Sequence, residues 1–596
     1  MKITQLTCVL PFALVPVCAE AAPAYWQFAP SPPMGWNSWD CFGTTLTEKQ
    51  AKEQADAMAQ RLKPFGWTYL TVDIQWYEPH SQGHGYKEGA PLEMDDYSRL
   101  VPAVTKFPSA DNGVGFKALA DYVHAKGLKF GIHMMRGIPK HAVRQNTALL
   151  GTSARAADIA NQRSTCPWNP DMFGVDMSKP GAQAYYDSLF QLYASWGVDL
   201  VKVDDIARPY DNVQKAEIEA IRKAIDKTAR PIVLSLSPGD TPIERGEHVM
   251  KNANMWRISD DFWDRWQPLY EMFGRLDRWT KYRAPGAWPD ADMLPFGIIE
   301  FSRPNRFTKD EQILCMTLWC IARSPLILGA DLTKLDDFTL NLLTNPEVLA
   351  VNQASSGNHQ LSRKDDLIVW TAEVPDSPDR YVALFNAQGN AIPYDMTKAL
   401  YRSSVIRKDG EVANISVSVK GVRKLALVVT DGGDNIFFDH ADWIEPALAG
   451  PRGTLKLSEQ KRTFAKAGYG EVRPNTTIEG KPVMIDGKVV DGIGTHAVSV
   501  IEYDIPEGYE TFTARGILSH SRPQKSGSVE FVVCTDAARV EIPDKNEVSV
   551  SFGDLGISGR ARVRDLWKKE ELGDFSEKFS REIPLHCAGL FRVSPQ

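Results

Sequence analysis

The sequence predicts a closed (β/α)8 barrel followed by an all-β C-terminal region. Between about residues 30 and 350, short apolar runs alternate with helical patterns, which is typical of βαβ units that form a parallel sheet. This many repeats favour a closed barrel over an open doubly wound sheet, and no glycine-rich phosphate loop follows the first strand. After LTNPEVLAVNQ (343–353) the helical periodicity disappears, and short alternating strands with Gly, Asp and Asn turns continue to the C-terminus.

Five apolar runs are predicted to be strands of the barrel. They are YLTVDIQW (69–76), LKFGIHMM (128–135), VDLVKVDD (198–205), PIVLSLS (231–237) and MWRISDD (255–261). FKALADYVHAKG has the pattern of a helix between the first two runs, and NVQKAEIEAIRKAIDKT has the same pattern between the third and the fourth. Alternation of this kind indicates a parallel sheet whose crossovers are helices.

The N-terminus, MKITQLTCVLPFALVPVCAEAAPA, is typical of a secretory signal peptide, with one lysine, an apolar stretch and the small-residue pattern Ala19-Glu20-Ala21. We therefore expect the protein to be exported, to the periplasm or to the exterior. A lipid-attached Cys18 is the weaker alternative, because a valine precedes it. No later segment has 18 or more consecutive apolar residues, so no membrane span is predicted.

The composition narrows the function classes. The chain of 596 residues is 43% hydrophobic and 24% charged, and its net charge of −7 argues against a nucleic-acid-binding surface. Sixteen tryptophans fit a protein that stacks on sugars, although large cores also use tryptophan. The six cysteines beyond the signal peptide form no CxxC pair and no His/Cys zinc spacing, which argues against a thiolate metal site.

Polar residues stand at the ends of four of the five predicted strands, where barrel enzymes carry their catalytic groups. These residues are Asp73, Lys202, Asp204, Asp205, Ser235, Ser237, Arg257, Asp260 and Asp261, and Asp290 and Asp292 follow in GAWPDADML (286–294). Lys202 and Asp204 are two positions apart and so point to the same side of a strand. A lysine beside a carboxylate keeps the carboxylate ionised, which suits a nucleophile, and a carboxylate on a later strand would supply the proton. The gap between the two carboxyls, which separates retaining from inverting glycosidases, is left open by the sequence.

These stretches resemble glycoside hydrolase family 27, the family of α-galactosidases and α-N-acetylgalactosaminidases. PPMGWNSWDCFG (32–43) is similar to its opening motif, YLTVDIQW to its aspartate-bearing second strand and VDLVKVDD to its nucleophile strand. WRISDDFWDRW (256–266) resembles the acid/base segment, PGAWPDADML the tryptophan–aspartate loop, and ARSPLILGADL (322–332) the last-helix region. Agreement in the same order across six motifs implies the family's barrel, followed by its antiparallel β-sandwich.

The resemblance implies two-step hydrolysis of a glycoside with retention, with no metal, nucleotide or redox cofactor. Asp204 would be the nucleophile and Asp261 the acid/base. The implied sugar-binding residues are Trp39, Asp73, Lys202, Arg257 and Asp292. Asp205 and Asp260 are expected to have capping or loop roles, because neighbours on a strand point away from each other.

Two departures from the family pattern concern the sugar itself. Galactose-specific members carry two consecutive aspartates on the second strand, which hold the 4- and 6-hydroxyls, but here the second position is Ile74, which accepts no hydrogen bond. Losing an acceptor relaxes or redirects the choice of sugar. Ser237 stands where galactosidases usually have a glutamate and resembles the N-acetylgalactosaminidase branch, although the Pro-Gly after it matches neither branch. The half-cystine pattern around the family's catalytic pocket is also missing.

The leading interpretation is an α-galactosidase-type retaining hydrolase that acts on oligo- or polysaccharides. The alternatives are an α-N-acetylgalactosaminidase, a β-L-arabinopyranosidase, whose sugar is galactose without its 6-carbon, and an α-glucan-acting relative. A competitor of another class is a carbohydrate-binding protein on an inactive barrel scaffold.

The C-terminal half contains a block that a single sandwich does not need. Residues 478–516 and 527–536 resemble the first half of the galactose-binding-like module NPCBM, and residues 398–443 resemble its second half. This order indicates a circularly permuted copy inserted into a loop of the sandwich. Its expected role is either sugar binding or that of a structural spacer, and His496 is expected to be a core histidine. The predicted domains are 1–21 (signal peptide), 22–352 (barrel), 353–393 with 541–596 (sandwich) and 394–540 (inserted module).

Overall fold

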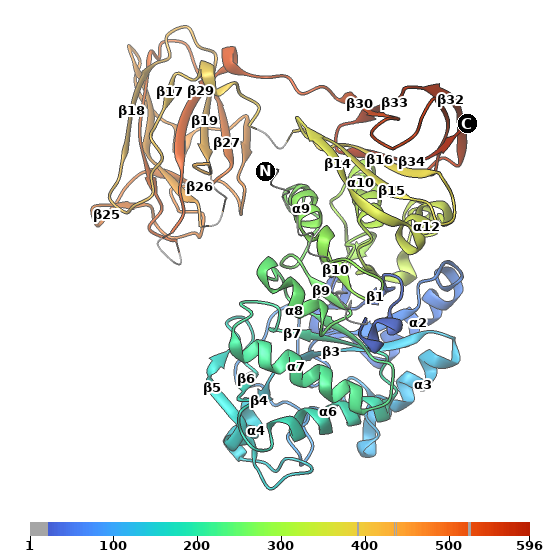
Figure 1. Cartoon of the computed structure of the whole chain (residues 1–596). Coiled ribbons are helices and arrows are strands. Elements are labelled where there is room, and N and C mark those ends of the chain that lie inside the picture. Colours follow the sequence, from blue (N-terminus) through green and yellow to red (C-terminus); the bar gives the residue numbers. More distant parts are fainter. Residues whose placement is uncertain (1–21, 390–391, 434–435, 437, 523–525) are drawn as a thin grey trace, which may run out of the picture.

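The computed structural model describes residues 22–389, 392–433, 436, 438–522 and 526–596 (Figure 1). The predicted signal peptide lies outside the described residues. The chain forms a barrel, an antiparallel sandwich and a separate β-rich module, which Figure 1 shows to the left of the sandwich. None of the described helices has the length and apolar composition that crossing a bilayer requires.

The barrel is built from eight parallel strands that pair in chain order, which confirms the predicted fold class. The strands are β1 (Met34–Asn37), β2 (Tyr69–Val72), β3 (Lys129–Met135), β7 (Leu200–Asp204), β8 (Val233–Leu236), β9 (Met255–Arg257), β10 (Trp288–Asp290) and β13 (Leu326–Leu328). The cylinder closes where the N–H of Leu294, just after β10, donates to the carbonyl of Ile327 in β13 at 2.7 Å. Gly35 lets β1 approach β2, since a Cβ there would lie 2.3 Å from the Tyr69 carbonyl oxygen.

Helices surround the barrel and cover the outer face of the strands (Figure 1). The longer ones are α2 (Glu48–Arg61), α3 (Lys117–Ala125), α6 (Ala182–Trp196), α7 (Asn212–Lys227), α9 (Trp266–Trp279), α10 (Lys309–Ala322) and α12 (Pro346–Ala354), and the shorter ones α1 (Trp39–Phe42), α4 (Lys140–Gln145), α5 (Ala156–Ile159), α8 (Gly246–Met250) and α11 (Asp337–Leu343). Helix α7 begins with a capping box of Asp211 and Gln214, and its isoleucines at 218, 221 and 225 are buried. The helices predicted between the strand pairs are α3 and α7.

Two strands end earlier than the sequence predicts. β2 ends at Val72 and β9 at Arg257, so Asp73, Asp260 and Asp261 lie in the loops that follow these strands. After β2, the side chain of Asp73 accepts a hydrogen bond from the N–H of Ile74 at 2.8 Å. Such local side chain–backbone bonds compete with the strand ladder and turn the chain away from the sheet.

The sandwich sheet draws its strands from two separate parts of the sequence. β14 (Ser356–Lys364), β15 (Leu367–Glu373) and β16 (Arg380–Asn386) continue into β34 (Cys587–Pro595), β31 (Arg560–Asp565) and β32 (Glu570–Ser576). An antiparallel pair of β30 (Lys545–Ser551) and β33 (Lys578–Pro584) packs on this sheet and shares a hydrophobic cluster with it. β16 pairs with β34 along its whole length, so the sheet joins two segments of the chain that lie on either side of the module in sequence.

The chain between β16 and β34 includes the module, which has two main sheets. One contains β17 (Tyr401–Arg402), β29 (Glu530–Thr535), β19 (Lys424–Thr430), β27 (Ser499–Asp504) and β22 (Phe464–Lys466), and the other β18 (Ala413–Ser418), β28 (Thr511–Leu518), β20 (His440–Gly450), β26 (Gly492–His496) and β23 (Arg473–Pro474), with β21 (Gly453–Lys456) at its side. Trp443 and Phe531 meet edge to face in the core between them. His496 is buried, and burial lowers its pKa to about 4, as expected for a core histidine.

A buried ion network supports the end of β7. Glu217 of α7 accepts hydrogen bonds from Arg136 (2.9 Å), from the N–H of Val175 (2.9 Å) and from the hydroxyl of Tyr186 (2.8 Å). Arg136 donates in turn to the carbonyl of Asp205 at 2.6 Å, and its own N–H donates to the carbonyl of Asp204 at 3.0 Å. The network therefore connects helix α7 to the strand end that carries the predicted nucleophile.

We predict that Glu217→Ala destabilises the protein by about 3–5 kcal/mol, because the buried guanidinium of Arg136 loses one of its two carboxylate partners, and the N–H of Val175 and the hydroxyl of Tyr186 lose their acceptor. The measurement is guanidinium unfolding followed by tryptophan fluorescence. Glu219→Ala on the same helix is the matched control: its side chain is 55% exposed and pairs with His248, so the loss should stay below about 1 kcal/mol. Equal losses in the two variants would contradict the prediction.

Candidate active site

The predicted residues meet at the C-terminal end of the barrel strands. Asp73 follows β2, Lys202 and Asp204 belong to β7, Ser237 follows β8, and Arg257 ends β9. They form two groups joined by ion pairs, one around Lys202 and one around Arg257. A small cavity inside the barrel is lined by Lys202, Ser237, Arg257 and Asp292, among other residues.

Lys202 pairs directly with Asp73 and not with Asp204. Its ammonium lies 2.9 Å from Oδ2 of Asp73, which also accepts a hydrogen bond from Asn37 at 2.7 Å. Although burial alone would raise the pKa of Asp73, the charge of Lys202 lowers it below the ordinary value. The direct ion pair of Lys202 therefore differs from the sequence-based expectation, because the lysine reaches across to Asp73 after β2. Its charge still lowers the pKa of Asp204, as expected.

Asp204 has a different direct partner, His133 of β3. Nε2 of His133 lies 2.9 Å from Oδ2 of Asp204, and its side chain is fully buried. Burial would raise the pKa of Asp204, but the hydrogen bond from His133 and the nearby charge of Lys202 hold this pKa well below its usual range. Asp204 is thus ionised across the physiological pH range, as a carboxylate nucleophile requires.

Arg257 organises the second group. Its Nη2 lies 3.1 Å from Asp261, its Nη1 lies 2.9 Å from Asp292, and Nη1 also lies 3.4 Å from the hydroxyl of Ser237. The guanidinium is buried, whereas the side chain of Asp261 is 52% exposed. Asp261 therefore stands at the rim, where a leaving group and water have access to it.

Asp292 holds the loop that carries Asp261. Its Oδ2 accepts the N–H of Phe262 at 2.7 Å, and Asp290 accepts the N–H of Asp292 at 2.9 Å. Burial raises the pKa of Asp292, and the neighbouring carboxylates Asp261 and Asp290 raise it further against the opposing charge of Arg257. Asp292 thus supports the position of Asp261 and lines the interior cavity.

The two aspartates that were expected to have other roles lie apart from both groups. Asp205 is buried in an ion pair with Arg136 at 2.9 Å, and Asp260 pairs at the surface with Arg208. Asp205 adopts a left-handed backbone conformation with φ +59°, which ends the strand and turns its side chain toward Arg136. The expected capping role of Asp205 is thus replaced by a buried ion pair, while Asp260 is a loop residue.

Three site residues escaped sequence reasoning: His133, Tyr86 and Asp40. Tyr86 stacks on Trp39, with ring centroids 6.2 Å apart, and its pKa is raised by burial and by Asp204, Asp73 and Asp261, which places it near all three carboxylates. Asp40 is buried, and burial and the charge of Asp292 raise its pKa well above the ordinary value. Only His133 had a detectable signal, a polar residue within the apolar run LKFGIHMM.

Ile74 and Trp39 complete the predicted set. Ile74 directly follows Asp73 and is only 1% exposed. Trp39 is half-buried at the start of α1, and its carbonyl oxygen lies 3.1 Å from Nε2 of His84. The polar pocket thus has an aliphatic residue beside Asp73 and an aromatic residue at its rim.

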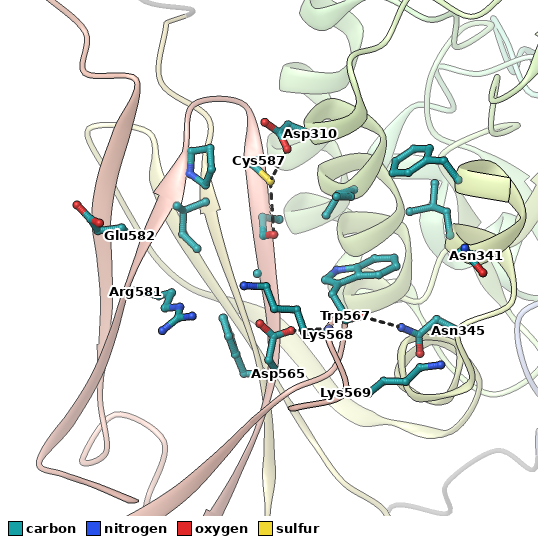
Figure 2. A pocket seen from close by; sticks show the side chains of 18 of the residues that line it. Asp310, Asn341, Asn345, Asp565, Trp567, Lys568, Lys569, Arg581, Glu582 and Cys587 are labelled. Atoms are coloured by element: carbon teal, nitrogen blue, oxygen red, sulfur yellow. Dashed lines mark hydrogen bonds between the residues drawn. The ribbon is translucent and has the colours of Figure 1, made fainter. Parts of the chain in front are cut away.

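A separate cavity of about 1030 Å³ lies between the barrel helices α10 and α11 and the sandwich (Figure 2). Trp567, Asn345 and Asp565 are among the residues that line it, and Cys587 donates a hydrogen bond to Asp310 at its wall. None of the predicted site residues is among the described residues that line this cavity. The carboxylates and cations described above therefore gather in the barrel and not in this cavity.

Comparison with known proteins matches all three parts of the chain. Family models match as "Alpha galactosidase A" (residues 173–354), "NPCBM/NEW2 domain" (391–449 and 453–546) and "Alpha galactosidase C-terminal beta sandwich domain" (520–593). Alpha-galactosidase 2 of Arabidopsis thaliana is 30% identical over 366 residues, which cover 61% of this chain and 76% of the relative.

Two solved structures are similar over nearly the whole chain. The family 27 β-L-arabinopyranosidase of Geobacillus stearothermophilus is 40% identical, with coverage of 96% of this chain and 99% of the other and a TM-score of 0.69. A putative α-N-acetylgalactosaminidase of Bacillus halodurans is 34% identical, with coverage of 95% and 97% and a TM-score of 0.62. The barrel, the module and the sandwich all fall within these matches. The chain therefore belongs to glycoside hydrolase family 27, and it is a glycoside hydrolase of the α-galactosidase type, as its motifs predict.

Proposed function

We propose that this enzyme releases terminal β-L-arabinopyranosyl residues from oligo- or polysaccharides, with retention of configuration. β-L-Arabinopyranose has the ring of α-D-galactose without the hydroxymethyl group at C5. The observation that carries the proposal is Ile74, which stands where galactose-specific members have the aspartate that holds the 6-hydroxyl.

The surroundings of Ile74 support this choice. Oδ1 of Asp73 is occupied by the N–H of Ile74, and its Oδ2 receives Asn37 and Lys202. A 6-hydroxyl bound beside the buried Ile74 would lose its hydrogen bonds to water without gaining an acceptor from this side chain, at a cost of about 1–3 kcal/mol. A sugar that has only hydrogen at C5 avoids this cost and buries its ring edge against the aliphatic side chain.

The similarity to the Geobacillus β-L-arabinopyranosidase is a second, independent support, since it extends across the module as well as the catalytic barrel. The second candidate is an α-galactosidase, which the curated plant relative favours. An α-N-acetylgalactosaminidase is favoured by Ser237, because a small residue there leaves room at the sugar's 2-position, and by the similarity to the Bacillus halodurans protein.

In the proposed mechanism the oxygen of Asp204 attacks the anomeric carbon, while Asp261 donates its proton to the departing glycosidic oxygen. The C1–O bond breaks, and a covalent glycosyl–Asp204 ester forms. Asp261, now ionised, removes a proton from water, whose oxygen attacks the same carbon and releases Asp204 as a carboxylate. Arg257 holds Asp261 in place, and the depressed pKa of Asp204 makes it the better leaving group in the second step.

The remaining predicted residues have binding roles in this proposal. Asp73 and Lys202 form the polar side of the pocket, where they would bind the hydroxyls at C3 and C4. Trp39 would cover one face of the ring, and Ser237 leaves the 2-hydroxyl unhindered. We also propose that the protein is exported and that its module holds it near polysaccharide.

The test of the proposed function is hydrolysis of aryl β-L-arabinopyranoside, α-galactoside, α-N-acetylgalactosaminide and α-glucoside. We expect the highest kcat/KM with the arabinopyranoside. Ile74→Asp should shift the ratio of galactoside to arabinopyranoside kcat/KM upward by about tenfold or more, because it restores an acceptor for the 6-hydroxyl. Ile74→Val, which stays apolar, should leave the ratio unchanged. A higher kcat/KM of the wild type for the galactoside would contradict the β-L-arabinopyranoside as the proposed substrate. Hydrolysis of none of the four glycosides would favour the binding-protein alternative.

The roles of the two carboxylates are tested separately. Asp204→Ala should lower kcat by more than about a thousandfold on every glycoside. Asp261→Ala should lower kcat/KM far less for a 2,4-dinitrophenyl glycoside than for a methyl glycoside. The dinitrophenolate is a good leaving group that departs without a proton. Asp260→Ala, next in the chain and exposed, is the control and should keep near wild-type rates. If Asp260→Ala were as damaged as Asp261→Ala, the acid/base assignment would be wrong.

His133 sets the pH range of the nucleophile. Catalysis needs ionised Asp204, so kcat/KM falls as the pH drops through the pKa of this carboxyl in the free enzyme. His133→Phe removes the hydrogen bond that lowers this pKa and should move the acid limb of the pH profile toward neutral pH. His124→Phe is the matched control and should leave the acid limb in place. Nε2 of His124 lies 2.7 Å from Oδ2 of Asp199, which is at the opposite end of β7 from Asp204. An unmoved acid limb in His133→Phe would contradict the role of this hydrogen bond.

A further inference from the structure

A series of aromatic side chains in contact with one another follows barrel strands at the same end as Asp261. We name Trp39, His84, Trp263 and Phe301 the aromatic rim. The ring of His84 meets Trp39 edge to face at 5.0 Å, Trp263 at 6.0 Å and Phe301 at 5.4 Å, measured between centroids. The rim thus runs without a break from a predicted pocket residue to the loop of the proposed acid/base.

The rim is assembled from four loops at the same end of the barrel. Trp39 follows β1, His84 lies in the loop after β2, and Trp263 is two residues beyond Asp261 in the loop after β9. Phe301 lies in the turn of a hairpin formed by β11 (Ile298–Ile299) and β12 (Arg303–Pro304). This hairpin follows β10 in the chain. Loops on the C-terminal face of a barrel line its active site, so the four aromatic residues share that face.

Specific contacts hold these loops together. Arg303 binds buried Asp264 through both terminal nitrogens, at 2.7 and 3.1 Å, and so links the Phe301 hairpin to the Trp263 loop. The N–H of Phe301 donates to the carbonyl of Cys41 at 2.8 Å, which ties the hairpin to α1. The rim is therefore a preformed surface, which is the arrangement that a binding subsite requires.

Core packing does not account for the outer part of the rim. Phe301 is 44% exposed and has φ +70°, a left-handed conformation that is strained for a bulky side chain. Of the described residues, Trp39 and Tyr86 pack against the barrel core, but Trp263 and Phe301 do not belong to that cluster. A strained, exposed aromatic residue beside a reaction centre indicates a functional surface.

We propose that Trp263, His84 and Phe301 form the subsite for the leaving group, and that this leaving group is itself a sugar of an oligo- or polysaccharide. The acid/base protonates the departing oxygen, so side chains adjacent to the exposed carboxyl of Asp261 face whatever departs. Sugars present flat C–H faces that stack on aromatic rings. The inference deepens the proposed function, since it rests on Asp261 as the acid/base, but it does not depend on which terminal sugar is cleaved.

The test compares substrates that share a terminal sugar and differ only in the leaving group. The probes are methyl β-L-arabinopyranoside against its disaccharide with galactose, and methyl α-D-galactoside against melibiose. Phe301→Ala should lower kcat/KM for the disaccharides about fivefold to tenfold and change the methyl glycosides less than about twofold. Phe301→Trp should restore the disaccharide rates, because it restores a stacking surface.

The matched control is Phe65→Ala. Phe65 is 37% exposed but precedes β2, at the opposite end of the barrel, so this variant should match the wild type on every substrate. Phe301→Gly should lose the disaccharide preference without a lower melting temperature, because glycine relieves the strain of a positive φ. A lower melting temperature together with equal losses on both substrates would assign Phe301 a structural role and overturn the proposal.

Binding separates this inference from the proposed catalysis. In the Asp204→Ala background, Phe301→Ala should weaken the Kd of the disaccharides about fivefold to tenfold and leave the methyl glycosides within about twofold. An unchanged Kd of the disaccharides would contradict the proposal that the rim binds the leaving group, even if the enzyme proves to be an active glycosidase. If the wild type hydrolyses none of the glycosides, the proposed function fails, while weakened disaccharide binding in Phe301→Ala would still support the rim.

Discussion

Two buried cations make it possible for the barrel to concentrate carboxylates at one end. Lys202 and Arg257 lie on strands two positions apart in the sheet, and each is in contact with acidic side chains. Removing a charge from water costs several kcal/mol, which is offset only when partners of opposite sign and hydrogen bonds surround it. Without Lys202 and Arg257, the buried carboxylates Asp73 and Asp292 would lose their direct ion-pair partners, and the charged form of each would be harder to keep.

The same arrangement gives chemically identical groups different properties. Asp204 receives a hydrogen bond from His133 and the field of Lys202, and its pKa is depressed. Asp40 and Asp292 are buried near other carboxylates, and their pKa values are raised. Asp261 reaches out of this environment on one arm of Arg257 and meets solvent. The surroundings alone therefore separate the pKa of Asp204 from the pKa values of Asp40 and Asp292, although all three are aspartates.

The walls around this charged centre are less constrained than the centre itself. Ile74 and Ser237 contribute no charge to the network, and the side chain of Ser237 meets Arg257 only through its hydroxyl, at 3.4 Å. The aromatic rim belongs to loops that are braced by Arg303 and Asp264, outside the strands. Family members can therefore retain the reaction and differ in sugar and leaving group, since the two sets of residues are structurally separate.

Much of the fold and part of the site could be predicted from the sequence. Apolar runs of strand length alternating with helical repeats determined the barrel, and six motifs in order determined the family, because both are local patterns along the chain. The same patterns predicted roles for Asp204 and Arg257, which end their strands, and for Asp261, which lies in the loop after β9.

The tertiary structure decided which of these side chains touch. It paired Lys202 with Asp73, 129 positions away, and Asp204 with His133, 71 positions away, where the spacing of two along one strand had suggested Lys202 and Asp204. It also brought Trp39, His84, Trp263 and Phe301 together from four loops. The physical reason is that closing the barrel sets residues from different strands side by side, and no period or spacing along the chain records the distances between strands.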